Sequence, residues 1–331
     1  MIQFDQDRLG EIFSGFSGKR IMVVGDLMID EYLIGHVRRI SPEAPVPVVD
    51  VKGQSVRLGG AANVALNIRS LGCNPIMVGV VGDDHYGTKL LKLLSKQGVG
   101  SDGVIRIPGR PTTVKTRIIG DSQHIARVDH EDATYLRHGD EENIFEKVTK
   151  ILDSVDGVIL QDYNKGVLTE DLIEFVVSHA RQKNLLITVD PKFKNFLKFR
   201  NVTVFKPNIK ETEEALAVKI NNEADLLMAG KQLKQSLNAD NILITRGSDG
   251  MSLFESDDRV MHVPTRVRKV ADVSGAGDTV ISTLTAALAG GASMREAAVI
   301  ANYAAGIVCE EVGIIPVDKD KLYKVCLGNN T

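Results

Sequence analysis

The chain has 331 residues, of which 43% are hydrophobic and 25% charged, and its formal net charge is -3. This composition indicates a globular protein with a sizeable core, and the charge excludes a broad basic surface for nucleic acid or a membrane. The N-terminus lacks the apolar stretch of a signal peptide, and the three cysteines, odd in number, have no metal-ligand spacing. We therefore expect a cytoplasmic protein with neither a nucleic-acid partner nor a membrane partner.

Short apolar, β-rich runs recur along the chain and are typical of strands buried on both faces. The predicted strands are residues 20–25, 75–81, 157–160, 185–189, 202–205 and 241–245. Helical patterns, such as those at 171–182 and 211–218, lie between them. This alternation predicts an α/β sandwich of three layers, with a central, mostly parallel sheet and ligands beyond the carboxyl ends of its strands. Since no repeat or linker divides the chain, we expect a single domain over residues 1–331.

Two stretches break this rhythm, at about 46–57 and 112–129. Both alternate β-branched or apolar residues with polar ones, as in VPVVDVKGQSVR and TTVKTRIIGDSQHIARVD. Such alternation is typical of half-exposed antiparallel strands, and neither stretch has a helical partner nearby. We expect a small accessory β-sheet that forms a lid over the active site. A plain extension of the edge of the main sheet is the alternative.

The most informative segment reads DVSGAGD, at residues 272–278, and a helix-like apolar run follows it directly. A glycine-rich turn at a helix N-terminus can direct the N–H groups of Gly275, Ala276 and Gly277 at one anion, and the helix dipole adds positive charge there. Asp278 in the first turn is a candidate to accept the proton of a substrate hydroxyl during phosphoryl transfer. A simple helix cap is the alternative.

This segment resembles the signature of the ribokinase-like, or PfkB-type, carbohydrate kinases, and further motifs of that family follow in order over about residues 18–320. The resemblance implies ATP and Mg²⁺ as cofactors, with Asp278 as catalytic base and the GAG amides around the moving phosphoryl group. It implies sugar contacts at Asp30, Gly59, Gly60 and Asn63, and nucleotide contacts at Asn208, Glu211, Thr245, Arg246, Gly247, Gly250 and Asn302. Glu211 would reach the magnesium ion through water, and Asp272 would help to hold a monovalent cation such as K⁺.

Within that family, RRISPEAPVPVV, RLGGAANVALNIRSLG and QDYNKG resemble the bacterial D-glycero-β-D-manno-heptose 7-phosphate kinases. Such enzymes transfer the γ-phosphate of ATP to the anomeric hydroxyl and yield the 1,7-bisphosphate, on the route to ADP-heptose for lipopolysaccharide core. Many are fused to a C-terminal nucleotidyltransferase with an H-x-G-H type site. The present chain ends at Thr331 without one, so a stand-alone kinase is expected.

A sugar that already carries a phosphate needs cations far from ATP. Lys165 and Lys192 follow predicted strands, where the active site should open, and are the first candidates. Arg117 and Arg127, on the predicted lid, are further candidates, although lid strands also carry arginine for solubility. Asp190 would bind a sugar hydroxyl or a water of the metal, or merely cap its strand.

Two other functions remain open at this point. One is another sugar or nucleoside kinase of the same family, and the discriminating observation is whether a phosphorylated sugar is required. The other is a non-catalytic sugar-binding protein on the same fold. Because exposed lid strands offer edges that can pair across a twofold axis, we also expect a homodimer.

Overall fold

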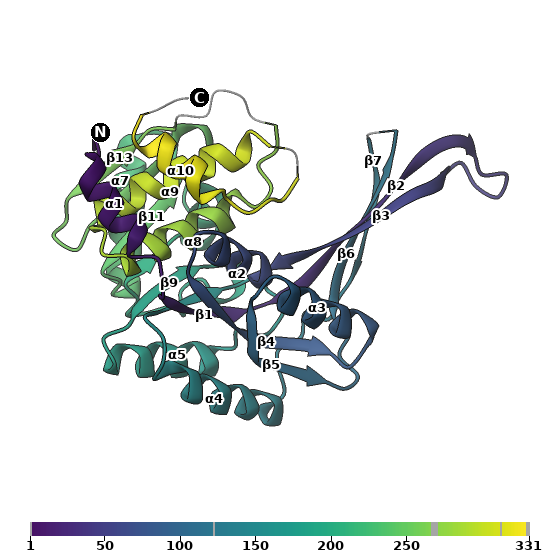
Figure 1. The fold of residues 1–331 in the computed structure, drawn as a ribbon, viewed down its shortest axis with the longest axis horizontal. Coiled ribbons are helices and arrows are strands. Elements are labelled where there is room, and N and C mark those ends of the chain that lie inside the picture. Colours follow the sequence, from purple (N-terminus) through teal and green to yellow (C-terminus); the bar gives the residue numbers. More distant parts are fainter. Residues whose placement is uncertain (1, 122, 266–270, 312, 329–331) are drawn as a thin grey trace.

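The computed structural model describes residues 2–121, 123–265, 271–311 and 313–328, and in these ranges the strands form a nine-stranded sheet and a four-stranded sheet (Figure 1). The order of the larger sheet is β13 (Val260–Val263), β12 (Met251–Phe254), β11 (Asn241–Thr245), β10 (Val204–Phe205), β9 (Leu186–Asp190), β8 (Gly157–Gln161), β1 (Arg20–Gly25), β4 (Asn74–Gly82), β5 (Gly100–Ile107). All neighbours from β11 to β5 are parallel, and β12 and β13 continue the sheet antiparallel. The predicted, mostly parallel central sheet is confirmed.

Helices cover both faces of this sheet and bury two separate hydrophobic clusters. One cluster packs under α1 (Gln6–Ser14), α2 (Ala61–Ser70), α3 (His85–Lys96), α8 (Ala276–Ala289), α9 (Met294–Cys309) and α10 (Lys319–Cys326). The other packs under α4 (His138–Leu152), α5 (Glu170–Gln182) and α7 (Glu223–Leu237), and Figure 1 shows α4 and α5 on the side of the sheet opposite α2 and α8. Strand β1 serves both, since Ile21 and Val23 enter the first cluster and Met22 and Val24 the second. This alternation gives the three layers.

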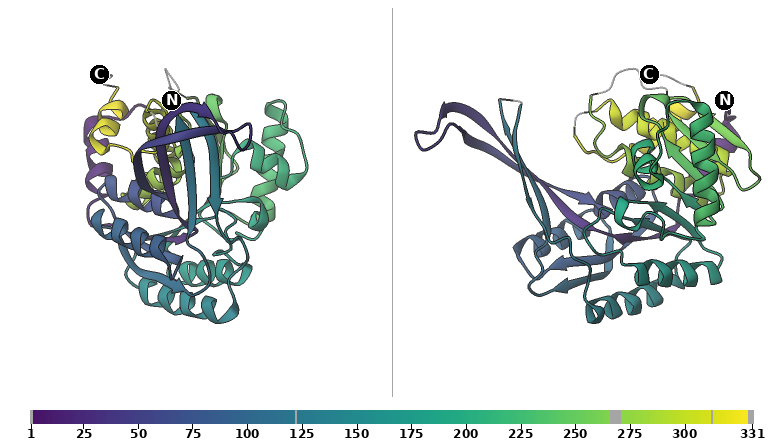
Figure 2. Two further views of the ribbon diagram at one scale, coloured as in Figure 1. Left: turned by 90° about the vertical axis from the view of Figure 1, so that its right-hand side faces the viewer. Right: turned by 180° about the vertical axis from the view of Figure 1, so that it is seen from behind.

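The smaller sheet, called the accessory sheet below, consists of β3 (Pro47–Gly60), β2 (Leu27–Ile40), β6 (Thr113–Gly120) and β7 (Gln123–His130), in that order. It stands away from the main body in Figure 1 and in the right view of Figure 2. Since it is a separate sheet, the alternative of an edge extension of the main sheet is wrong.

Two details of the accessory sheet differ from the sequence prediction. The 112–129 stretch is a hairpin of two strands, with Asp121 in the left-handed region at φ 49°, and residue 122 lies outside the described residues. Strand β2, which was not predicted, pairs with β3 on one side and with β6 on the other. Its first residues are buried and its last are exposed, so no single alternation marks it. This change of pattern along the strand is the reason that it was not predicted.

Several boundaries also shifted. Strand β10 contains only two of the four predicted residues. Helix α6 (Ile209–Leu216) both begins and ends two residues earlier than the predicted helix at 211–218. Two short 3-10 turns, Phe193–Asn195 and Gly247–Asp249, follow β9 and β11. No helix in the described part of the chain is both long and apolar enough to cross a membrane.

Candidate active site

Asp278 lies in the first turn of α8, behind a turn that only glycine forms easily. Gly275, the N-cap, has φ 81°, and a Cβ there would lie 3.2 Å from Ile314 and 3.5 Å from Nδ2 of Asn63. Asp278 itself is 6% exposed. Its Oδ2 accepts a 2.7 Å hydrogen bond from Nδ2 of Asn63, and its Oδ1 accepts one of 2.5 Å from the hydroxyl of Tyr163. The carboxylate is therefore oriented from both sides.

Burial raises the pKa of Asp278 to about 6, and the hydrogen bonds from Tyr163 and Asn63 oppose this rise. The group is thus mostly anionic at neutral pH, yet it holds a proton far better than an exposed aspartate does. A carboxylate with this balance suits a general base that must accept a proton from a hydroxyl. Tyr163 stays a donor, because burial and the nearby Asp278 raise the pKa of its phenol well above the usual value.

Beneath Asp278, the ends of neighbouring parallel strands form a row of side chains. Gln161 ends β8, Asp190 ends β9, and the two are partners in register. Lys206 directly follows β10, whose Phe205 pairs with Val189. Asp190 accepts a hydrogen bond from Nε2 of Gln161 (3.2 Å) and forms a 2.9 Å ion pair with Nζ of Lys206. Asp190 is therefore the centre of a buried polar row.

Beside the glycine-rich turn lies a cavity of about 450 Å³. Its lining unites motifs that are far apart in the sequence: Asn208, Thr245, Gly247, Gly250, Ala276, Gly277 and Asn302. The rest of the wall is largely apolar, with Val273, Val280 and Ala305 among its residues. An apolar slot that ends at a helix N-terminus can take an aromatic base at one end and phosphates at the other.

Residues 208–211, which read NIKE and are called the NIKE element below, connect this cavity to the sheet. Asn208 caps α6 and Glu211 completes a capping box, with its Oε2 2.9 Å from the backbone nitrogen of Asn208. Oε1 of Glu211 is bound by the ammonium group of Lys192. Lys192 thus contacts the Asn208–Glu211 element, and its ammonium group also lies over the ring of Tyr163, 6.0 Å from the ring centre, on the loop that carries Lys165.

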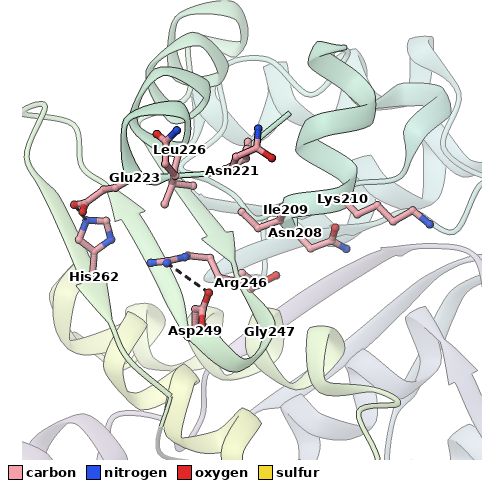
Figure 3. A pocket seen from close by; sticks show the side chains of 13 residues that line it. Asn208, Ile209, Lys210, Asn221, Glu223, Leu226, Arg246, Gly247, Asp249 and His262 are labelled. Carbon is pink, nitrogen blue, oxygen red and sulfur yellow. Dashed lines mark ion pairs between the residues drawn. The ribbon is translucent and has the colours of Figure 1, made fainter. Parts of the chain in front are cut away.

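Arg246 faces a different hollow. A second pocket of about 520 Å³ shares Asn208, Thr245 and Gly247 with the first (Figure 3). Arg246 extends into it toward Asp249, at 3.8 Å, and also donates to the hydroxyl of Ser252. Of the residues predicted to contact the nucleotide, Arg246 is therefore placed behind the Thr245–Gly247 turn and not in the cavity beside Gly277.

Three of the residues predicted to contact the sugar, Asp30, Gly59 and Gly60, lie where β2 and β3 leave the main domain. Asp30 is buried, and a Cβ at Gly59 would lie 2.3 Å from its Oδ2. Gly60 has φ 58° and would meet the carbonyl of Asp26. Gly59 therefore makes room for the Asp30 carboxylate and Gly60 for the Asp26 carbonyl, in addition to any room they leave for a ligand.

Arg117 and Arg127 both occupy the accessory sheet but have different neighbours. The guanidinium of Arg117 binds Oδ1 of Asp30, whereas Arg127 binds Asp129 within its own strand and is largely exposed. From β3, Arg57 donates to the carbonyl of Ile314, the residue that packs against Gly275. The accessory sheet therefore touches the loop beside the glycine-rich turn, as a lid would.

Lys165 lies at the junction of the main domain and the accessory sheet. Its ammonium group is 2.7 Å from Oε1 of Glu131, and Lys115 of β6 is 3.3 Å from the other carboxylate oxygen. Two lysines thus converge on one carboxylate. Sequence reasoning found Lys165 but not Lys115, which the strand pattern alone marks only as a polar position on β6.

Sequence reasoning also missed Asp26, which organises the loop that carries Tyr163 and Lys165. It is 1% exposed and accepts hydrogen bonds from the backbone N–H groups of Tyr163, Lys165 and Val167 at 2.8 to 3.1 Å. Burial raises its pKa, against the effect of these bonds. The signal was a lone aspartate directly after the first strand.

Asp272, predicted to help to hold a monovalent cation, binds backbone groups. Its Oδ1 accepts from the N–H of Ser274 at 2.8 Å, and its Oδ2 accepts from the N–H of Gly313 at 3.1 Å. These bonds fasten the glycine-rich turn to the segment before α10. The side chain of Ser274 bonds to the same carboxylate, and these hydrogen bonds lower the pKa of Asp272 against the effect of burial.

The family model of the "pfkB family carbohydrate kinase" matches residues 19–321. Curated relatives named "Bifunctional protein HldE" include that of Trichlorobacter lovleyi, 43% identical over 93% of this chain, and that of Geobacter metallireducens, 44% identical over 88%. The matches cover 63% and 60% of those relatives, so this chain spans under two thirds of their length.

Solved structures with the same fold include a ribokinase of Arabidopsis thaliana complexed with ribose and ATP, with a TM-score of 0.73 at 20% identity. Another is phosphofructokinase-2 of Escherichia coli in complex with potassium, with a TM-score of 0.75 at 19% identity. Each alignment covers 93% of this chain and 99% of the other. At this level of identity they show the ribokinase-like fold alone. Since the family model spans nearly the whole chain, this protein belongs to the pfkB family of carbohydrate kinases.

Proposed function

We propose that this carbohydrate kinase transfers the γ-phosphate of ATP to the C1 hydroxyl of D-glycero-β-D-manno-heptose 7-phosphate, in the cytoplasm, on the route to ADP-heptose. The observation that carries the proposal is the position of Asp278. Its buried carboxylate is oriented by Asn63 and Tyr163, beside a cavity lined by Gly277. The heptose motifs in the sequence and the likeness to the HldE proteins support the substrate.

In the proposed reaction, Asp278 orients the C1 hydroxyl and accepts its proton as the oxygen attacks the γ-phosphorus. Phosphoryl transfer has a loose transition state, so positioning and neutralisation of charge supply most of the acceleration. The glycine-rich turn receives the moving group. The buried ammonium group of Lys206 contributes positive charge from below, since Nζ would lie 3.7 Å from a Cβ at Gly277.

The residues present fit a magnesium ion that is held mainly by the triphosphate. Both oxygens of Glu211 are engaged, by the backbone of Asn208 and by Lys192, which favours contact through water over direct ligation. Among the described residues, no group of three His, Cys, Asp or Glu side chains is placed to hold a metal. When bound, Mg²⁺ would offset the charge of the β- and γ-phosphates. The position of Lys192 suits the same task, and we assign it to the ATP side.

For the sugar phosphate, the geometry favours Lys165, with Lys115 beside it and Arg117 within the same sheet. Lys115 and Lys165 converge on the carboxylate of Glu131, and an incoming phosphate would compete for both ammonium groups. Arg127 is exposed and lies nearer the tip of the β6–β7 hairpin than Asp129, its ion-pair partner, which makes it the weakest candidate of the set.

A coupled assay of ADP release tests the function. The purified protein, with MgATP, is offered heptose 7-phosphate, unphosphorylated heptose, ribose, fructose and fructose 6-phosphate. Turnover confined to heptose 7-phosphate is the expected result. Turnover of a different sugar would retain the kinase and replace the substrate, and no turnover with any of the five would favour the non-catalytic alternative.

We also propose that two copies pair through their accessory sheets. Apolar side chains are exposed along it, among them Ile34 (46%), Val51 (50%) and Val128 (54%), and β3 and β7 are its open edges. Light scattering should give twice the chain mass, and Val51→Lys with Val128→Lys should give a monomer. A wild-type monomer at micromolar concentration would contradict the pairing.

A monovalent cation beside Asp272 is the last part of the proposal. If such a cation supports the glycine-rich turn, activity in KCl should exceed activity in tetramethylammonium chloride at equal ionic strength. Equal rates in the two salts would remove the cation from the site.

A further inference from the structure

Gln161 occupies an unusual position between the two carboxylates of the site. Its amide nitrogen lies 3.2 Å from Oδ2 of Asp190 and 3.4 Å from Oδ1 of Asp278. Gln161 is 1% exposed. The register explains the arrangement, because Gln161 and Asp190 are paired residues at the ends of adjacent parallel strands, and the first turn of α8 lies over them.

The orientation of this amide is fixed by its neighbours. A carboxylate accepts hydrogen bonds and donates none, so only the NH₂ group of Gln161 can face Asp190 and Asp278. The reversed amide would set its oxygen against two carboxylates. Both hydrogens are then used, and the Oε1 atom is left buried without a hydrogen-bond partner among the described residues.

Such an orphaned acceptor is costly, since a buried polar atom loses its hydration and receives nothing in return. An apolar side chain of similar length at this position would avoid the loss. The chain nevertheless places a glutamine where it can donate to both acids at once. The benefit must therefore lie with the two carboxylates and not with the packing of Gln161 itself.

We propose that Gln161 is a positioning residue that links the catalytic base to the buried Asp190–Lys206 ion pair and keeps that base anionic and aimed at the substrate hydroxyl. Without the bridging amide, Asp190 and Asp278 face each other with no donor between them. Repulsion between like charges then favours protonation of one of them. The inference rests on the proposed function for its kinetic readout, but its electrostatic part does not.

The other charged and titratable groups that face Asp278 set the scale of the effect. Asp190 of β9 raises the pKa of Asp278, whereas Lys206 after β10 and the hydroxyl of Tyr163 lower it. Lys192 follows β9 and interacts with both acids. Because these groups remain in a Gln161 variant, we expect the pKa of Asp278 to change while Asp278 still acts as the base.

The test compares Gln161→Met, which keeps the length of the side chain and removes the amide, with the matched control Thr283→Val. Thr283 lies in α8 with Asp278, is buried, and its hydroxyl likewise lacks a hydrogen-bond partner, but it does not contact the carboxylates. In Gln161→Met we expect the pKa that governs the acidic limb of the profile of kcat/KM against pH to rise by about one unit. The rate should therefore fall about fivefold at pH 6 and stay within about threefold of wild type at pH 8.5. Thr283→Val should leave the limb in place.

A second readout needs no turnover. Carbon-13 NMR of labelled aspartate carboxyls, with Asp278→Asn to assign the signal, gives the pKa of Asp278 directly in wild type and in Gln161→Met. An upward shift supports the linkage even if the sugar substrate proves to be another one. An unchanged pKa, together with a rate that falls equally at every pH, would show that Gln161 only fills space. If Gln161→Met does not fold, Gln161→Glu offers the same comparison, because a third acid must raise the limb further.

Discussion

The hydroxyl of Tyr163 donates a 2.5 Å hydrogen bond to Oδ1 of Asp278, although 115 residues separate the two along the chain. Tyr163 sits on a loop after β8 that three backbone hydrogen bonds to Asp26 hold in place. Asn63, from the second helix, binds the other oxygen of the same carboxylate. The direction in which the base points is therefore decided by three elements that meet only in the folded protein.

Replacement of the base is the first prediction. Asp278→Asn keeps the size of the side chain but cannot accept the proton, so kcat should fall at least about a hundredfold. ATP binding, measured by calorimetry, should stay close to wild type, because the nucleotide cavity is lined by other side chains. Near-normal turnover of the variant would remove Asp278 as the base.

The same substitution should also change how stability depends on pH. The pKa of Asp278 is about 6 in the fold, raised above the ordinary aspartate value of 3.8 chiefly by burial. Between these two pKa values the folded protein keeps a proton on the carboxyl that the unfolded chain has lost. The free energy of unfolding of the wild type therefore falls as the pH rises through this interval. Between pH 5 and pH 8 this loss amounts to about 1.4 kcal/mol, and Asp278→Asn should not show it. Urea unfolding at the two pH values measures the difference, and parallel changes in both proteins would contradict the buried, raised carboxyl.

Loss of the tyrosine hydroxyl gives the third prediction. In Tyr163→Phe, the carboxylate of Asp278 loses a hydrogen-bond donor that lowers its pKa. The pKa that governs the acidic limb of the profile of rate against pH should therefore rise by about one unit. Tyr135→Phe is the control, since its hydroxyl binds Asn195 and not the base. If both variants show the wild-type profile, the Tyr163 hydrogen bond does not govern the base.

The two lysines should separate in their effects. Lys165→Met should raise KM for the sugar phosphate by about 10- to 100-fold, the range for loss of a charge-assisted hydrogen bond, with little effect on KM for ATP. Lys192→Met should do the reverse, because Lys192 contacts Glu211 of the NIKE element. Initial rates with each substrate varied in turn make the comparison. A rise in the sugar-phosphate KM in both variants would return Lys192 to the sugar site.

The sheet could be predicted where apolar runs are short and continuous. Strands β1 and β11 were placed to the residue, because both are buried almost throughout. Strand β2 was missed, since it passes from the core of the main domain to the exposed tip of the accessory sheet and changes its pattern on the way. The strands could therefore be predicted from periodicity, except where one strand runs from a buried into an exposed environment.

Several site residues were recognised because their motifs are local. The GAGD turn and the Asn208–Glu211 capping box are each complete within four residues. Gln161 and Lys206 carry no local signal of this kind. Their partners lie on neighbouring strands, and nothing along the chain states which strands become neighbours.

The sequence by itself determined the family, the parallel sheet, the glycine-rich turn and the candidate for the base, because apolar periodicity, glycine at positive φ and capping are properties of short segments. Only the tertiary structure decided which atoms hold that base. Strand register places Gln161, Asp190 and Lys206 in one row, and the docking of α8 brings Asp278 above it. Register and docking arise from packing of the whole core, so the electrostatics of the site belong to the fold and not to any one motif.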